Sequence, residues 1–303
     1  MKSLWRGVIP AITTPFREDY SIDYEAFASH CRWMAESGCT GVVIGGSLGE
    51  GGSLTLAEKG KLIAAALTVP GLHVILGVSA LTTKEAEEIA RTGHGEGAHG
   101  LMVLPPYVYI GDWRETKAHV SALCHATPLP CMLYNNPIAY TTDFVPQQVV
   151  ELLDANPTLH AIKESAADVR RVTDLRALAE GRLEILVGVD DLIVEGVAAG
   201  AVGWIAGLVN AFPRESVELF ELARAGRVQE AFDLYRWFLP LLRMDTVPKF
   251  VHLIKFAQQE VGRGVERLRP PRLPLVGEER DQAAAVLKTA LAARPSLAPA
   301  ILG

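Results

Sequence analysis

Short apolar segments alternate with amphipathic segments along most of the chain. The short segments are rich in valine, isoleucine and leucine and are flanked by glycine, proline or polar residues, which is typical of buried strands. We predict strands at residues 7–12, 40–44, 73–78, 101–104, 130–134, 159–165, 183–187 and 201–205.

The segments between them carry helix signals. Residues 24–37 have helical periodicity and end at Gly38, and Thr55 with Glu58 forms a capping-box pattern. Residues 168–180 give a further helix. Strands that alternate with helices pair in parallel through right-handed crossovers. Eight such units predict an α/β fold, a closed (β/α)8 TIM barrel.

The chain continues beyond the eighth unit with segments that are almost entirely helical. We predict helices at residues 213–225, 228–242, 247–261 and 281–293, with a proline-rich connector at 269–274. The domain organisation that follows is a barrel over residues 1–212 and C-terminal helices over residues 213–303. The latter comprise the eighth barrel helix and a helical appendage.

Composition narrows the class of protein. The chain of 303 residues is 49% hydrophobic, enough for a large core, and no segment reaches the roughly 18 apolar residues of a membrane span. The net charge of −6 includes no basic block, which argues against nucleic acid or a membrane as partner. Cys31, Cys39, Cys124 and Cys131 lack CxxC spacing, and no signal peptide is visible. We therefore expect reduced thiols in a cytoplasmic protein.

One lysine differs from all the others in its position. Lys163 lies near the end of a predicted strand, whereas the remaining lysines fall at a terminus or in predicted helices. An uncompensated buried ammonium group is costly, so this position suggests a chemical role for the amine. Two structural alternatives are open: the side chain reaches the surface, or it pairs with Glu164.

The strand ends lack the residues of several common sites. Active-site residues of such barrels lie where the strands end, and no histidine falls there. This argues against a metal-dependent aldolase. Asp190 and Asp191 are the best candidates for a metal, but a helix N-cap explains them more simply. No Walker-type or GxGxxG loop follows a strand. We therefore expect no metal and no other cofactor.

The residues that remain suit covalent amine catalysis on a carbonyl. A desolvated lysine has a pKa below the free value of about 10.4, which leaves some neutral amine to attack. Tyr134, on the neighbouring strand end, is a candidate proton shuttle. The backbone N–H groups of residues 46–49 are a candidate nest for a carboxylate. The alternatives are a tyrosine packed for its area and an ordinary glycine-rich turn. We expect substrate contacts from the strand-end residues Gly46, Ser47, Leu48, Tyr107, Asn136, Gly188 and Val189.

Three motifs together resemble the family of dihydrodipicolinate synthase and N-acetylneuraminate lyase. GSLGE at 46–50 resembles its GTTGE or GSTGE motif, YNNP at 134–137 its YNxP motif, and IKE at 162–164 its IKE or IKD motif. The resemblance covers the whole chain. It implies a barrel that assembles as a homotetramer, a dimer of dimers. It also implies that pyruvate-like 2-oxo acids bind as a Schiff base on Lys163, with Tyr134 as proton relay.

The chain departs from the synthase pattern in the half of the site that takes the second substrate. Leu48 replaces a motif hydroxyl, and Val108 stands where the synthase has the second of two tyrosines, which reaches into a neighbouring subunit. Residues 138–140, Ile-Ala-Tyr, replace the arginine that follows YNxP. A synthase activity inferred from the fold alone is therefore unsafe.

Within the family, GSLGE, YNNP, residues 187–191 and the RPPRLPL segment most resemble the hydroxyproline-degradation branch. Those enzymes convert 1-pyrroline-4-hydroxy-2-carboxylate to 2-oxoglutarate semialdehyde and ammonia. The resemblance implies the same activity here. The alternatives are an aldolase or dehydratase of 2-keto-3-deoxy sugar acids or of N-acetylneuraminate type, dihydrodipicolinate synthase, and a non-catalytic binding protein.

Overall fold

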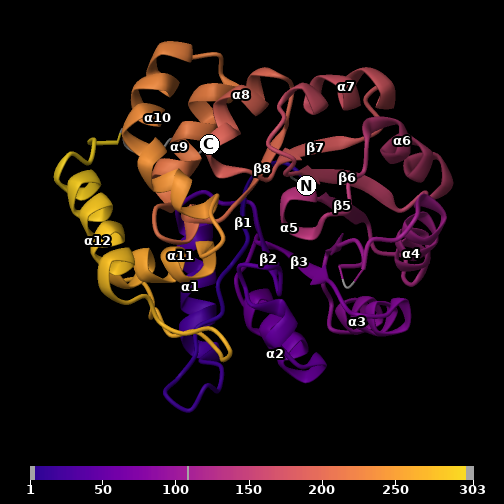
Figure 1. The fold of residues 1–303 in the computed structure, drawn as a ribbon, viewed down its shortest axis with the longest axis horizontal. Coiled ribbons are helices and arrows are strands. Elements are labelled where there is room, and N and C mark those ends of the chain that lie inside the picture. The colour runs from indigo at the N-terminus through magenta and orange to yellow at the C-terminus, as the bar shows by residue number, and fades with distance from the viewer. Residues whose placement is uncertain (1–3, 108, 298–303) are drawn as a thin grey trace.

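The structure, a computed structural model, describes residues 4–107 and 109–297 and confirms a parallel (β/α)8 barrel with C-terminal helices (Figure 1). Eight strands in these residues form one sheet in the order β1-β8-β7-β6-β5-β4-β3-β2. The strands are β1 (Gly7–Pro10), β2 (Gly41–Ile44), β3 (His73–Val78), β4 (Gly100–Val103), β5 (Cys131–Asn135), β6 (Leu159–Glu164), β7 (Glu184–Val187) and β8 (Gly203–Ala206). Each overlaps a strand predicted from the sequence.

The barrel closes between its first two strands. Ala11 and Val43 form a parallel bridge just beyond β1. Thr40 N donates to Val8 O and Ile12 N donates to Val43 O, both at 3.0 Å. This seam leaves no free sheet edge and brings the loops that follow β1 and β2 together.

Helices follow the strands and surround the barrel. They are α1 (Tyr24–Glu36), α2 (Leu56–Leu67), α3 (Thr83–Gly95), α4 (Trp113–His125), α5 (Pro137–Tyr140), α6 (Pro146–Ala155), α7 (Arg170–Ala179), α8 (Ile193–Ala198) and α9 (Pro213–Arg224). Short 3₁₀ turns are η1 (Gly51–Ser53), η2 (Asp190–Leu192) and η3 (Leu208–Asn210). The capping box of Thr55 and Glu58 begins α2, and Gly38, at φ +99°, follows α1, both as expected. Helices α4, α5 and α6 were not predicted.

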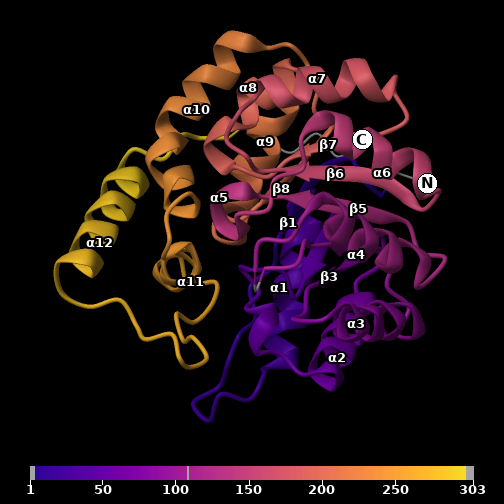
Figure 2. The ribbon, with the colours of Figure 1, turned by 45° about the vertical axis from the view of Figure 1, so that its right-hand side comes forward.

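The C-terminal appendage lies on one side of the barrel (Figures 1 and 2). It consists of α10 (Val228–Leu242), η4 (Arg243–Asp245), α11 (Phe250–Glu260) and α12 (Gly277–Ala292). The rings of Phe212 and Phe238 pack with their centroids 5.9 Å apart. Because this contact joins the end of the barrel segment to α10, the apolar core continues across residue 212. The division at that residue stays a prediction.

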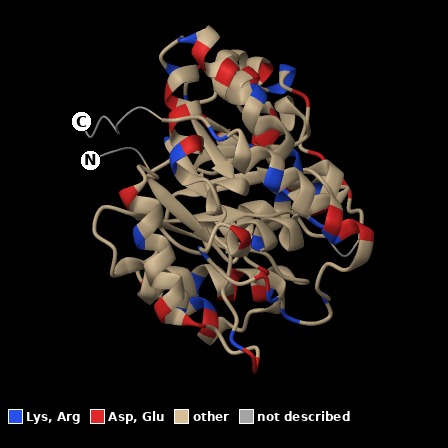
Figure 3. Ribbon diagram, turned by 90° about the vertical axis from the view of Figure 1, so that its left-hand side faces the viewer, with Lys and Arg blue, Asp and Glu red and all other residues tan. Residues whose placement is uncertain are grey.

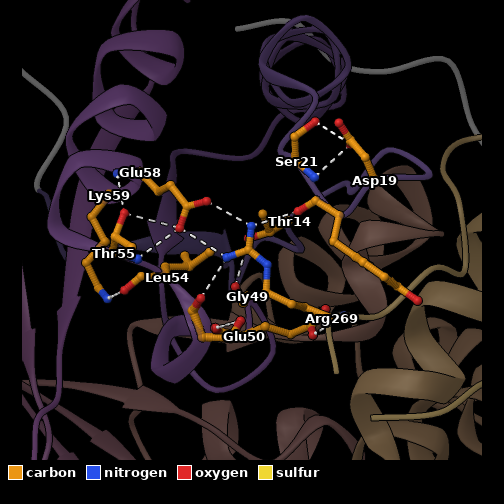
Figure 4. Close-up of polar contacts among 12 residues, drawn as sticks. Thr14, Asp19, Ser21, Gly49, Glu50, Leu54, Thr55, Glu58, Lys59 and Arg269 are labelled. Carbon is orange, nitrogen blue, oxygen red and sulfur yellow. Dashed lines mark hydrogen bonds and ion pairs between the residues drawn. The ribbon is translucent and has the colours of Figure 1, made fainter. Parts of the chain in front are cut away.

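A buried ion pair ties the appendage to the loop after β2. Lys255 Nζ on α11 lies 2.9 Å from Glu50 Oε1, and the two side chains are 1% and 0% exposed. The amine also donates to Thr14 O, and Arg269 N donates to Glu50 Oε2. The guanidinium of Arg269 donates to both carboxylate oxygens of Glu58 at 2.8 and 3.0 Å (Figure 4). The RPPRLPL segment therefore clamps the loop after β2 and the start of α2.

The charged surface carries both signs. Acidic and basic residues are interspersed over the outer helices (Figure 3), as the absence of a basic block in the sequence predicts. Within the described residues, no helix combines the length and the apolar character needed to cross a membrane.

Replacing one partner of the buried pair will destabilise the protein strongly. In Glu50→Gln, the Lys255 ammonium stays buried without its counter-charge, and we expect a loss of about 3–5 kcal/mol in the free energy of unfolding. Urea unfolding followed by circular dichroism measures this loss. The matched control is Glu279→Gln, which removes the exposed partner of Lys249 and will cost less than about 1 kcal/mol. Equal losses in the two variants would contradict the assignment.

Candidate active site

The centre of the site is the contact between Lys163 and Tyr134. The two residues are paired in register on β6 and β5, so their side chains leave neighbouring strands at the same level. Lys163 Nζ lies 4.0 Å from the centroid of the Tyr134 ring. Both residues are buried, with 7% and 5% of their surfaces exposed. The arrangement agrees with the expectation that these strand ends meet.

Neither structural alternative for Lys163 holds. Its side chain does not reach the surface, and among the described residues its amine makes no hydrogen bond or ion pair. Glu164 accepts instead from Asn135 Nδ2 and from Ala166 N, the latter at 2.7 Å. The amine is therefore both buried and unengaged.

Two other lysines are buried, and the sequence analysis did not identify them. Lys59 donates to Gly51 O at 2.7 Å and to Leu54 O at 2.8 Å, and burial lowers its pKa to about 8. Burial also lowers the pKa of Lys255, against the opposing effect of Glu50. Both amines donate hydrogen bonds that hold loops, which distinguishes them from Lys163.

Asn136 positions the hydroxyl of Tyr134. Its Nδ2 donates to Tyr134 OH at 2.9 Å, while its Oδ1 accepts from Ala139 N at the start of α5. The phenol oxygen is thus an acceptor in this bond, which leaves its hydrogen free for another partner. This suits the predicted proton shuttle.

Tyr140 is a member of the site that the sequence analysis missed. It is the last residue of α5, its hydroxyl is hydrogen-bonded to Ser47 Oγ, and its ring stands edge-on to Tyr134 with centroids 5.8 Å apart. Burial raises the pKa of Tyr140 above its ordinary value, with Tyr134 adding to the effect. The exposed ring of Tyr107 lies 6.2 Å from that of Tyr140. Pro137, which begins a single helical turn after YNNP, was the available signal.

The loop after β2 presents free backbone donors. The N–H groups of Ser47 and Leu48 have no acceptor within the described part of the chain. Gly49 packs so closely that an added Cβ would fall 2.7 Å from Ile12 O, and its carbonyl accepts from Thr14 Oγ1. The geometry fits the expected carboxylate nest. The side chain of Leu48 itself is buried in the core, and Gly46 faces Met102.

Gly188 makes room for Lys163. A Cβ at this position would fall 2.6 Å from Lys163 Cε and 2.0 Å from Ser165 Oγ. The absence of a side chain at Gly188 therefore sets the path of the lysine. Val189 instead lines a small cavity of about 20 Å³ with Glu164 and Leu192.

The interpretation of Asp190 as a helix N-cap is wrong. Val189 occupies the cap position of η2. The Asp190 carboxylate is fully buried and accepts from Trp204 Nε1 at 3.0 Å, and from Gly207 N and Leu208 N at 3.2 and 2.8 Å. Burial raises its pKa to about 6. It therefore joins the end of β7 to the end of β8. Among residues 4–107 and 109–297, no three histidine, cysteine, aspartate or glutamate side chains are grouped to hold a metal.

Comparison with known proteins gives one consistent result. The model of the dihydrodipicolinate synthetase family matches residues 4–290. The chain is 32% identical over 275 residues to the 4-hydroxy-tetrahydrodipicolinate synthase of an Exiguobacterium strain, covering 90% of this chain and 92% of the relative. It is 30% identical over 276 residues to the enzyme of that name from Rhizobium meliloti, covering 89% and 92%.

Solved structures agree with the sequence relatives. Dihydrodipicolinate synthase from Aquifex aeolicus superposes with a TM-score of 0.89 at 26% identity, covering 94% of this chain and 97% of that one. YagE, a prophage protein of the same family from E. coli K12, was crystallised with pyruvate. It superposes with a TM-score of 0.89 at 25% identity, covering 95% and 99%.

A methyl group at residue 188 will displace the lysine without unfolding the protein. In Gly188→Ala the colliding atoms are side-chain atoms that can move, so we expect stability to change by about 1–3 kcal/mol. Misplacing the amine by an ångström will lower the rate of adduct formation about 100-fold. Borohydride reduction in the presence of pyruvate, stopped at successive times, measures the rate at which the ligand is trapped on the protein. Gly95→Ala is the control, because a Cβ there meets no atom within 4 Å. A wild-type trapping rate in Gly188→Ala would contradict the role of this contact.

Proposed function

The chain belongs to the dihydrodipicolinate synthetase family, and from this premise we propose that Lys163 forms a Schiff base with a small 2-oxo acid or cyclic imino acid. The chain is a lyase of that family. The observation that carries the proposal is the amine of Lys163, which is buried, unengaged and 4.0 Å from the Tyr134 ring centroid. A neutral amine in such a place can attack a carbonyl or imine carbon.

The residues that we propose to hold a 2-oxo acid are all present. The free N–H groups of Ser47 and Leu48 would hold the substrate carboxylate, and Lys163 would attack the adjacent carbon. Tyr134 would carry the proton that is exchanged when the adduct forms and when the neighbouring C–H is broken. The pyruvate bound to YagE supports a 2-oxo acid as the ligand.

The other half differs from that of a synthase. Residues 137–144 contain no arginine that could clamp the carboxylate of a second substrate, and an apolar group does not replace a bidentate guanidinium. Ile138 is exposed and Tyr140 turns back to Ser47. Val108, another of the three predicted departures, lies outside the described residues. We therefore propose an activity other than that in the names of the relatives.

The substrate that we favour is 1-pyrroline-4-hydroxy-2-carboxylate. Attack by Lys163 at the imine carbon opens the ring and acidifies the adjacent C–H. Loss of the 4-hydroxyl as water, followed by hydrolysis, gives 2-oxoglutarate semialdehyde and ammonia. Leu48 and Ala139 offer no polar side chain here, and a polyhydroxylated substrate would need more hydrogen-bond partners than this small one. The alternative is an aldolase or dehydratase of 2-keto-3-deoxy sugar acids. A homotetramer in the cytoplasm stays a prediction.

The adduct can be located directly. Borohydride reduction in the presence of pyruvate should add the mass of the reduced ligand to the peptide that contains Lys163, because the reduced Schiff base is a stable secondary amine. Peptide mass spectrometry will find the peptides of Lys59 and Lys255 unlabelled, since both amines are engaged. Labelling that persists in Lys163→Ala would refute the assignment.

The products distinguish the candidate reactions. We expect ammonia release from 1-pyrroline-4-hydroxy-2-carboxylate and no pyruvate release from 2-keto-3-deoxy sugar acids. Condensation of pyruvate with aspartate semialdehyde should fall at least about 30-fold below that of a dihydrodipicolinate synthase run in parallel. The reason is that a lost charged contact costs about 2–5 kcal/mol. Enzyme-coupled assays for ammonia, pyruvate and the condensation product make the measurement. Synthase turnover near that of the reference enzyme would show that the second-substrate half has been misread.

A further inference from the structure

Two carboxyl groups lie on the side of Lys163 that faces away from β5 and Tyr134. In the sheet, β6 stands between β5 and β7, and β8 follows β7. Asp190 and Asp245 meet at the end of β8. Asp190 accepts from Gly207 N at 3.2 Å, and a Cβ built on Gly207 would fall 2.0 Å from Asp245 Oδ1. The Asp245 carboxyl therefore lies directly against the Cα of Gly207.

Asp190 accepts hydrogen bonds from three donors, whereas the Asp245 side chain has no hydrogen-bond partner among the described residues. The residue as a whole is half-buried, but its Oδ1 is closed to solvent and has no hydrogen-bond partner among the described residues. Ser165 Oγ, next to Gly188 and Lys163, is buried and unpartnered in the same way. An unsatisfied buried polar atom costs stability, so two of them at the neighbouring ends of β6 and β8 call for a functional explanation.

The surroundings of Asp245 favour its neutral form. Burial raises its pKa well above the ordinary value, and the nearby Asp190 raises it further, while Lys163 opposes the shift. Two neighbouring buried carboxyls do not both ionise readily, and Asp190, with three donors, is the better anion. Asp245 is thus the member of the pair that keeps a proton.

Among the described residues, the lysines and arginines of α10, α11 and η4 pair with other groups, and burial lowers the pKa of His252 on α11. On α11, Lys249 pairs with Glu279 and Lys255 with Glu50. On α10, Arg236 pairs with Asp233. Arg243, on η4 itself, contacts Asp191 of η2 at 3.4 Å. The charges that act on Asp245 are therefore those of Asp190 and Lys163.

We propose that Asp245 is a second proton-transfer residue of this site, a carboxylic acid that protonates the leaving hydroxyl of the Schiff-base intermediate. The inference rests on the proposed function, since it concerns the elimination step that follows adduct formation on Lys163. It assigns the two proton transfers to opposite sides of Lys163. Tyr134 on β5 takes the proton of the C–H, and Asp245 on η4, packed against Gly207 after β8, protonates the leaving group.

Every bond and proton of the elimination step is accounted for by the adduct, Asp245 and solvent water. After the C–H next to the iminium carbon is broken, the adduct is an enamine. Its electron pair forms the new carbon–carbon double bond as the carbon–oxygen bond at C4 breaks. The carboxyl proton of Asp245 goes to the departing hydroxyl oxygen, so that water leaves and Asp245 becomes a carboxylate. A proton from solvent water restores the acid before the next turnover.

Asp245→Asn tests the inference, because the amide keeps the size of the side chain and cannot act as an acid. A general acid contributes about 10²–10⁴-fold, so kcat for ammonia release should fall by about that factor. Trapping of pyruvate on Lys163 should be unchanged. In the wild type, kcat should fall as pH rises through the pKa of Asp245, because the acid must be protonated. The variant should lack this alkaline limb.

A second substrate separates an acid from a merely structural residue. The 4-fluoro analogue expels fluoride, which needs far less help from an acid than hydroxide does. The defect of Asp245→Asn should therefore shrink to less than about 10-fold with this analogue. Asp191→Asn, a neighbouring acid on η2, is the control and should keep wild-type kcat on both substrates.

The outcomes separate this inference from the proposed function. Three results in Asp245→Asn would overturn the role of Asp245: wild-type kcat, an equal loss of kcat on both substrates, or a loss of pyruvate trapping. None of them would contradict the proposal that Lys163 of the wild type forms a Schiff base. A wild-type protein that traps pyruvate but releases no ammonia would instead overturn the proposed substrate, and the assignment of a leaving-group acid with it.

Discussion

The buried ion pair between Glu50 and Lys255 is the constraint on which the site depends. Glu50 lies at φ +55° directly after the loop that carries the free N–H groups of Ser47 and Leu48. A left-handed backbone at a non-glycine residue persists only when its surroundings hold it. Here the side chain is held by Lys255 and by the backbone of Arg269. The last third of the chain thereby fixes the geometry of a loop encoded near its beginning.

Contacts among the other buried polar groups explain why the Lys163 amine has no hydrogen-bond or ion-pair partner among the described residues. Lys59 donates to loop carbonyls, and Lys255 donates to Glu50 and to loop carbonyls. Asn135 donates to Glu164. The carboxylates of Glu50, Glu164 and Asp190 are thus already engaged, whereas Asp245 Oδ1 has no hydrogen-bond partner among the described residues. What faces the amine is the ring of Tyr134 on one side and the Gly188 backbone on the other. Burial without a partner is costly, and the stability of the rest of the barrel supports it.

The sequence predicts most of the fold and the centre of the site, and the failures have physical causes. The strands are buried on both faces, so they read as short continuous apolar runs between glycine, proline or polar residues, and all eight could be predicted. Helix α4 was missed because polar residues, Thr116 and His119, occupy its buried face, and α5 is a single turn with no periodicity to detect. The contact between Tyr134 and Lys163 could be predicted because both lie where neighbouring parallel strands end, and such ends meet at one edge of the barrel. The role of Asp190 could not, because a cap and a buried acceptor look alike locally, and only the indole of Trp204 from the next strand distinguishes them.

The distance along the chain between Glu50 and Lys255 has a consequence for synthesis on the ribosome. The strands that carry Tyr134 and Lys163 emerge well before α11, so an incomplete barrel would expose the Lys163 amine while the loop after β2 is still unclamped. Contacts this far apart in sequence form late, since the intervening chain must be ordered first. The amine therefore exists for a time beside a loop whose backbone donors are not yet fixed. The C-terminal segment, rather than the strands themselves, is what completes the surroundings of that amine.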